Sequence, residues 1–226
     1  RSRGLGDVYK RQALLQSAGQ ICFAPLANQP EFAAFWWPNY LRIMDWFLQF
    51  EHTQRAEKPR LLVETPARYP LHLSPERSLE LHGRADRIEQ YPDGTFSLYD
   101  FKTGRSPTAK EVTARLESQL TVTAALVKEG GFAKVDHRTL RLFDYIKLGG
   151  AEGGAPANLP KNIKDIRLDD LVDQHWRGLL MLVKAHWLEG RGFAARLYPP
   201  KRNSVGPYDH LARVKEWAVS GEEEEA

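Results

Sequence analysis

Residues 81–104, LHGRADRIEQYPDGTFSLYDFKTG, constrain the fold of this chain more than any other stretch. Two runs of alternating apolar and polar residues flank a Pro-Asp-Gly sequence, which is typical of a tight turn between antiparallel strands. A type I turn closed by the glycine in a left-handed conformation pairs Tyr91 with Thr95. Counting outward along both strands places Asp86 opposite Asp100, so the sequence predicts two carboxylates that face each other across a hairpin.

The two opposed carboxylates need a cation between them, because like charges directly opposite each other destabilise a sheet. A period of two places Asp100 and Lys102 in line with Phe96 and Leu98 on a buried face, where an unpaired charge is costly. Carboxylates with room for water suit Mg²⁺. A metal beside an ammonium group can stabilise the charge that develops on a phosphate. The pattern therefore predicts a site for phosphodiester hydrolysis that includes Asp86.

A structural alternative accounts for the same carboxylates without any chemistry. Either aspartate can form an ordinary ion pair on the sheet surface, with Arg84, Arg87, Lys102 or Arg105. The basic residues around the predicted site can bind DNA phosphates or can simply lie on a solvated surface. These basic residues are Arg84, Arg87, Arg105, Lys110 and Arg115.

The rest of the chain alternates between helical and extended patterns. Apolar residues at steps of three and four predict helices at about 13–22, 31–51, 106–128 and 168–189. The aromatic-rich helix at 31–51 has Pro38 near a break or a first turn. Strands are predicted at 61–64, 79–90, 95–102 and 140–148, with loops containing Pro66, Pro70 and Pro75. This order predicts an α/β fold with a mixed central β-sheet flanked by helices.

We expect a single domain, because 226 residues can form one hydrophobic core but not two large ones. The first residues, RSRGLGDVYKRQ, resemble a translated adapter sequence, which implies that the natural N-terminal part is missing. The expected segments are a non-native stretch at 1–12, a domain at 13–219 and an acidic tail at 220–226. Within the domain we expect a helical lead-in at 13–58, a catalytic sheet and helix at 59–148, a loop at 149–167 and C-terminal helices at 168–219.

Composition excludes several classes of protein. Cys22 is the single cysteine of the sequence, which excludes an internal disulfide and a metal cluster held by several thiolates. No run approaches the roughly 20 apolar residues of a membrane span. The net charge of +3 is mildly basic. We therefore expect a cytoplasmic protein without a membrane partner.

The motifs GRADRI and YDFKTG resemble the second and third motifs of the PD-(D/E)xK nuclease superfamily in its RecB-like branch. The resemblance implies a restriction-endonuclease-like core and a nuclease that uses Mg²⁺ or Mn²⁺. It also implies that Asp86, Asp100 and the Phe101 carbonyl bind metal, and that Lys102 is the catalytic lysine. The acidic residue of the preceding strand matches Glu64, as a further catalytic residue and metal ligand. The downstream glutamine of the family, which supports the site or contacts DNA, matches Gln119.

Three features depart from the family pattern. The family has a tyrosine four residues after the glutamine, where this chain has Thr123. The G-x-x-x-H pattern of RecB-like nucleases does not occur before residue 64, in accord with the expected truncation. Some relatives hold an iron–sulfur cluster with four cysteines, which the lone cysteine excludes here, and we expect no nucleotide site either.

The flanking segments narrow the resemblance further. EFAAFWWPNYLRIMDWF at 31–47 and PYDHLARVKEW at 207–217 are similar to segments of AddB proteins. This resemblance implies a bacterial subunit that acts on single strands or duplex ends of DNA, together with an AddA-type helicase–nuclease subunit, in end resection. The alternative is a module of the same fold that binds DNA or supports assembly without cleaving.

Overall fold

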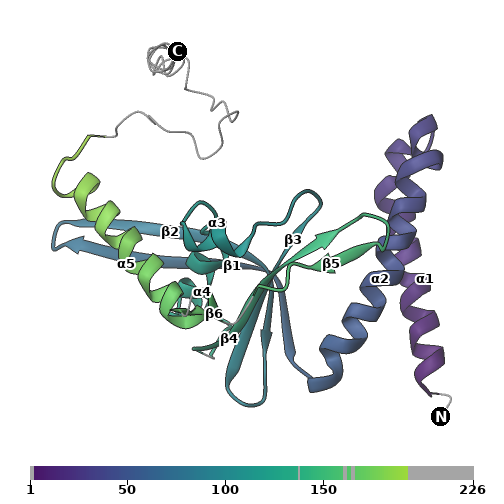
Figure 1. Cartoon of the computed structure of the whole chain (residues 1–226), viewed down its shortest axis with the longest axis horizontal. Helices are drawn as coiled ribbons and strands as arrows, with labels where there is room; N and C mark the ends of the chain where they lie inside the picture. The colour runs from purple at the N-terminus through teal and green to yellow at the C-terminus, as the bar shows by residue number, and fades with distance from the viewer. Residues whose placement is uncertain (1–2, 137, 160–161, 164–165, 193–226) are drawn as a thin grey trace, which may run out of the picture. The chain divides into compact units, whose positions relative to one another are not determined.

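The computed structural model describes residues 3–136, 138–159, 162–163 and 166–192 (Figure 1). The helices are α1 (Arg3–Phe23), α2 (Trp37–Gln54), α3 (Ala109–Thr113), α4 (Gln119–Lys128) and α5 (Leu168–Trp187). The strands are β1 (Arg60–Ser74), β2 (Arg77–Gln90), β3 (Thr95–Lys102), β4 (Thr139–Leu148), β5 (Gly154–Pro156), β6 (Asn162–Ile163) and β7 (Ile166–Arg167). None of the helices in these described ranges is long and apolar enough to cross a membrane.

The chain divides into two compact units, Arg1–Trp176 and Arg177–Ala226, and the central sheet belongs to the first. The segment at 207–217 and the acidic tail at 220–226 lie outside the described residues. The expected boundaries at residues 12 and 219 stay predictions.

The central sheet is five-stranded, with the order β1-β2-β3-β4-β5. β3 and β4 are parallel, whereas the other neighbouring strands are antiparallel. Two parallel strands need a crossover connection, and α3 and α4 lie in the connection between β3 and β4 (Figure 1). The predicted fold class, a mixed central sheet flanked by helices, is confirmed.

The turn between β2 and β3 has the predicted form. Gly94 has a φ of +84°, in the left-handed region. The backbone N–H of Tyr91 donates to the carbonyl oxygen of Thr95 over 2.9 Å. Asp93 accepts a second hydrogen bond from the Thr95 N–H, also over 2.9 Å. Local turn chemistry therefore sets the register of the hairpin.

The prediction of loops at Pro66 and Pro70 is wrong, because β1 continues through both residues to Ser74. The backbone N–H of Arg68 donates to the carbonyl oxygen of Gly131 over 2.9 Å, on the side of β1 away from β2. The direction of hydrogen bonding alternates along an antiparallel strand, so the nitrogens of residues 66 and 70 also point away from β2. The β1–β2 ladder therefore loses no donor at either proline, and prolines on an edge strand disfavour further pairing.

Alternate side chains of β3 face different helices. The ring of Tyr99 lies 5.9 Å from the ring of Phe50 on α2. Asp100 points the other way, toward the start of α4, where Gln119 hydrogen-bonds to it. Since both faces of β3 are covered, residues 96–100 are all buried.

The helix predicted at 106–128 is two helices in the structure. Thr108 caps α3, because its hydroxyl accepts from the Glu111 N–H and the Glu111 carboxylate accepts from the Thr108 N–H. Arg115 then adopts a φ of 60°, which interrupts the helical path. The break allows a new helix to begin at Gln119, beside β3.

The first N-terminal helix is longer than predicted, and the second begins later. α1 begins at Arg3 rather than near residue 13 and runs beside α2 (Figure 1). Pro38 lies in the first turn of α2, as expected, directly after a turn of π-helix. The Tyr40 hydroxyl donates to the Leu15 carbonyl oxygen over 2.5 Å and so joins the two helices.

Part of the loop predicted at 149–167 is a hairpin, because β5 pairs with the end of β4. Gly153 has a φ of +86°, and a Cβ at this position would overlap the Arg42 carbonyl group of α2. A Cβ on Gly154 would lie 2.5 Å from the Trp46 ring. The two glycines therefore allow this hairpin to lie directly against α2.

Gly153→Ala is expected to destabilise the protein more than Gly150→Ala. Both positions have a positive φ, which costs alanine roughly 1–2 kcal/mol. Of these two glycines, Gly153 lies against α2 and Gly150 does not, since nothing lies within 4 Å of a Cβ at Gly150. Overpacking adds roughly 1–3 kcal/mol at Gly153. Urea denaturation followed by circular dichroism measures both changes, and equal values would contradict the close approach of this hairpin to α2.

Candidate functional site

β2 and β3 separate at the predicted site. The ladder between them ends at the Arg87–Tyr99 pair, so Asp86 and Asp100 occupy the next position of the same register. Beyond the ladder, the backbone N–H of Phe101 donates to Asp86 Oδ2 over 3.0 Å. The two aspartates therefore lie where the strands part, on the same face of the sheet as the start of α4.

Asp100 is the more buried of the two carboxylates, at 4% exposure. Burial raises its pKa, Lys102 opposes this shift, and the negative charges of Asp86 and Glu117 raise the pKa further. Lys102 Nζ lies 2.6 Å from Asp100 Oδ2 as an ion-pair partner. Within the described residues, the Lys102 ammonium is the partner that the structure gives this buried oxygen. A carboxylate oxygen has two lone pairs, so Oδ2 can bind a cation beside Lys102.

Gln119 connects the carboxylate to the ammonium group. Its Nε2 donates to Asp100 Oδ1 over 2.5 Å, and its Oε1 accepts from Lys102 Nζ over 2.8 Å. The Lys102 side chain is 29% exposed, so it is open to solvent and to a substrate. Asp86 lies across from Asp100 in the same cluster. The structure therefore brings together four of the residues singled out in the sequence, which are Asp86, Asp100, Lys102 and Gln119.

Glu64 lies between the pairs Val63–Arg87 and Thr65–Ala85 of β1 and β2, at the level of Asp86. Its side chain is 60% exposed, and its carboxylate forms an ion pair with Arg84 over 3.0 Å. Its φ of 45° is unusual for a non-glycine residue in a strand. The ion pair holds the Glu64 carboxylate beside Arg84, and the role of Glu64 as a metal ligand stays a prediction.

The prediction that Arg87 lies beside the candidate site is wrong. This residue is 3% exposed and binds the carboxylates of Glu51 and Glu89 on the α2 side of the sheet, away from the candidate site. Arg105 is exposed but forms two hydrogen bonds with Glu111, of 2.7 and 2.8 Å. The candidates for phosphate contact that lie exposed are therefore Arg84, Arg105, Lys110 and Arg115.

The donor set fits a hard divalent cation. Asp86 is half-buried, and Asp100 offers a buried oxygen whose described partner is the Lys102 ammonium. Within the described residues, no group of three acidic, histidine or cysteine side chains is close enough to hold a metal together. Mg²⁺ accepts such a set, because it commonly binds through one or two carboxylates and completes its shell with water and phosphate oxygens. The Phe101 carbonyl stays a predicted ligand.

Sequence reasoning did not identify Tyr145 as part of this cluster. In the parallel pairing of β3 and β4, Tyr145 is the partner of Asp100, and it is 1% exposed. Lys102 Nζ lies 5.6 Å from the centre of its ring. The alternating pattern of LRLFDYIKL indicates a strand, but only the register of the parallel pair places Tyr145 beside Asp100.

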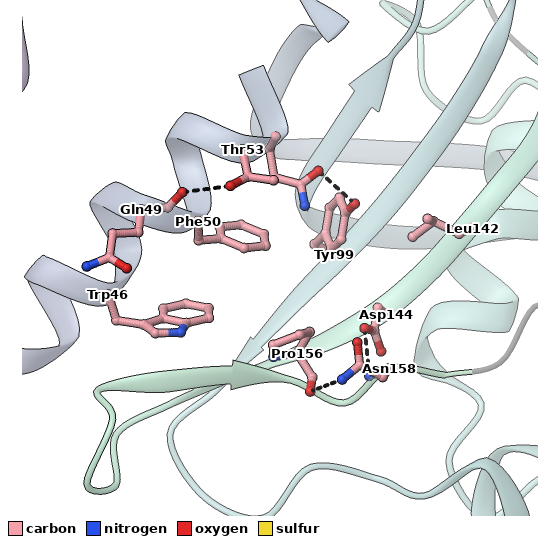
Figure 2. Close-up of a pocket in the computed structure, with 10 residues that line it drawn as sticks. Trp46, Gln49, Phe50, Thr53, Tyr99, Leu142, Asp144, Pro156 and Asn158 are labelled. Carbon is pink, nitrogen blue, oxygen red and sulfur yellow. Dashed lines mark hydrogen bonds between the residues drawn. The ribbon is translucent and has the colours of Figure 1, made fainter. Parts of the chain in front are cut away.

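A cavity of about 420 Å³ lies on the other face of the sheet, between α2 and the strands β3, β4 and β5 (Figure 2). Figure 2 shows Trp46, Phe50 and Tyr99 around it, together with the carboxylate of Asp144. The Asp144 carboxylate accepts hydrogen bonds from three backbone N–H groups, including that of Asn158. It is the one charged side chain among the residues described around this cavity. This lining does not suit a phosphate, so the candidate active site is the Asp100 cluster.

Comparisons with known proteins agree with the motifs. Residues 9–199 match the PD-(D/E)XK nuclease superfamily. An uncharacterised protein of Rickettsia bellii is 27% identical over 218 residues, which cover 89% of this chain and 24% of that protein. An uncharacterised protein of Rickettsia conorii is 26% identical over 132 residues, which cover 58% of this chain and 15% of that protein. The chain thus spans a quarter or less of the length of these relatives, and over most of its own length it belongs to the PD-(D/E)XK nuclease superfamily.

Proposed function

We propose that this chain is a metal-dependent DNA nuclease domain that hydrolyses phosphodiester bonds. The observation that carries the proposal is the meeting of Asp86, Asp100, Lys102 and Gln119 where β2 and β3 separate. A buried carboxylate beside a second carboxylate is costly to place and is typical of functional sites, which supports the proposal.

Each side chain has a role in this proposal. Asp86 and Asp100 would hold a divalent cation, which would acidify a water molecule and stabilise the negative charge of the reacting phosphate. Lys102 places its ammonium group beside the same carboxylate, where it can orient the attacking water or neutralise the phosphate. Gln119 holds Asp100 and Lys102 in a fixed relative position through its two hydrogen bonds.

The biological setting is also part of the proposal. The segment at 31–47, which is similar to AddB proteins, supports an AddB-type subunit that works with an AddA-type helicase–nuclease subunit. The substrates are then single strands or duplex ends of DNA, and the process is end resection in double-strand break repair in the bacterial cytoplasm. The names of the similar Rickettsia proteins state no function, so this assignment rests on the resemblance of the motifs and flanks.

A second candidate is a module of the same fold that binds DNA or supports assembly without cleaving. One observation favours it, namely the ion pair that keeps the Glu64 carboxylate on Arg84. If the chemistry needs a third carboxylate and Glu64 cannot leave Arg84, the cation lacks a ligand and the site is inactive.

Cleavage of end-labelled single-stranded DNA is expected in Mg²⁺ or Mn²⁺ and not in EDTA, because the two aspartates alone cannot stabilise a phosphate that carries the same charge. Products are resolved on a denaturing gel over a range of cation concentrations. Restoring excess Mg²⁺ to the EDTA-treated protein should restore cleavage. A protein that retains DNA on a filter but releases no product in either cation would favour the non-cleaving module.

A further inference from the structure

We infer that Tyr145 is a positioning residue of this site, whose ring holds the Lys102 ammonium group in place when the ammonium is not bound to Asp100. This inference rests on the proposed function. It concerns a side chain that belongs to none of the nuclease motifs, on a strand that follows the helix of Gln119.

The position of Tyr145 follows from the sheet. β4 runs parallel to β3, and the register pairs Tyr145 with Asp100 and Lys147 with Lys102. Side chains of paired residues point to the same face. Tyr145 is therefore the direct neighbour of Asp100 on the face that α4 covers, and Lys102 is on the same face two residues farther along.

The Lys102 ammonium group lies over the aromatic ring of Tyr145. Lys102 Nζ lies 5.6 Å from the ring centre, within the range in which an ammonium group is attracted to an aromatic face. The hydroxyl oxygen is buried beside the backbone N–H of Leu120, at the start of α4. Because Tyr145 is 1% exposed, the ring is held by packing and cannot follow the lysine outward.

Lys102 needs a second contact because its first partner, Asp100, would also bind the cation. Its ammonium lies 2.6 Å from Asp100 Oδ2, the oxygen of this carboxylate that Gln119 does not contact and that a cation would share. Two positive charges cannot occupy one carboxylate oxygen without repulsion. When a cation binds there, the Lys102 ammonium keeps its hydrogen bond to Gln119 Oε1 and its attraction to the Tyr145 ring, so it stays within reach of a phosphate.

The experiment compares four variants of the 226-residue chain. Tyr145→Phe keeps the ring, and Tyr145→Leu removes it. Phe143→Leu is the matched control, because Phe143 is buried on the same strand and face, two residues away, and pairs with Leu98 instead of Asp100. Pentafluorophenylalanine at position 145 keeps the size of the ring but reverses its charge distribution, which tests the attraction even if Tyr145→Leu fails to fold.

The first readout does not depend on activity. Protons on the carbon next to Lys102 Nζ should show an upfield ring-current shift in NMR spectra, both in EDTA and in Mg²⁺, with Lys102→Met used for assignment. We expect the shift to remain in Tyr145→Phe and Phe143→Leu and to disappear in Tyr145→Leu. A shift that Tyr145→Leu leaves unchanged would overturn the inference.

The second readout is cleavage of single-stranded DNA at saturating Mg²⁺. Tyr145→Leu and the pentafluoro variant should each lower kcat roughly tenfold with KM unchanged, while Tyr145→Phe and Phe143→Leu stay within about twofold. Equal kcat values for Tyr145→Leu and Phe143→Leu would overturn the inference. If the unaltered chain cleaves nothing, the proposed function fails, and the NMR shift still decides whether Tyr145 holds Lys102.

Discussion

Asp100→Asn is expected to lower kcat on single-stranded DNA by about 10²- to 10³-fold, the usual effect of removing one group that stabilises a transition state electrostatically. Asparagine keeps the size of the side chain and can still accept the hydrogen bond from Gln119 Nε2. It removes the negative charge that pairs with Lys102 and that, in the proposed function, would hold a cation. Cleavage rates at saturating Mg²⁺ measure the loss.

The fold of Asp100→Asn should remain intact. Burial raises the pKa of Asp100, so in the folded state its ionised form costs free energy at any pH above the unfolded pKa. Asparagine removes this cost but also the ion pair with the partly exposed Lys102, and the two changes offset each other to within about 1 kcal/mol. Stability is therefore expected to be maintained while activity is lost.

Asp93→Asn is the matched control for this substitution. It makes the same chemical change in the β2–β3 turn, at an exposed residue that hydrogen-bonds only within the turn in the described structure. Its kcat should equal that of the unaltered chain. Cleavage by purified, folded Asp100→Asn at the rate of Asp93→Asn would refute the proposed active site.

Arg87→Met is expected to destabilise the protein by roughly 3–5 kcal/mol, the usual cost of removing one partner from a buried ion pair. Arg87 lies between Glu51 of α2 and Glu89 of β2, and their exposed fractions are 3%, 7% and 0%. Its guanidinium carbon also lies 5.6 Å from the centre of the Phe50 ring. Methionine fills much of the space but leaves the buried Glu89 without its cation and Glu51 with the more exposed Arg55 alone as its described ion-pair partner.

The pH dependence identifies the cause of this loss. Burial raises the pKa of Glu51, but the hydrogen bonds and positive charges of Arg87 and Arg55 together outweigh burial, and the net shift of the pKa is downward. Glu51 therefore adds stability above its unfolded pKa, and this stability is lost as the pH falls through its folded pKa. Without Arg87 the burial cost remains and the pKa rises, so Arg87→Met should lose more stability at neutral pH than near about pH 4, where glutamates begin to take up protons.

Arg55→Met is the control for Arg87→Met. Arg55 also binds Glu51, over 2.7 Å, but its side chain is 50% exposed. An ion pair open to solvent contributes about 0–1 kcal/mol, so this variant should unfold at nearly the same urea concentration as the unaltered chain. Equal midpoints for Arg87→Met and Arg55→Met would contradict the importance of the buried network.

The features that the sequence predicted correctly depend on neighbours along the chain. The β2–β3 hairpin follows from alternating residues and a turn that needs Gly94 in a left-handed conformation, and both are local properties. Two strands joined by a known turn have a known register. The position of Asp86 and Asp100 at the same level of the hairpin could therefore be counted from the printed sequence.

The features that were predicted wrongly depend on hydrogen-bond direction and on which element covers which face. Pro66 and Pro70 indicate a loop unless their nitrogens point away from the neighbouring strand, and only the sheet decides that direction. Arg87 was expected beside the aspartates, yet it alternates to the opposite face and is buried beneath α2. The charge of a side chain does not show whether a helix will supply its partner.

By itself, the sequence determined a β-hairpin with two carboxylates and a lysine at its open end, because short-range turn geometry and strand alternation place them there. Only the tertiary structure decided that Gln119 joins Asp100 to Lys102, and that the Tyr145 ring lies beside both. These partners come from a helix start and a parallel strand far along the chain. Their approach depends on the packing of whole elements against the sheet, which no local pattern encodes.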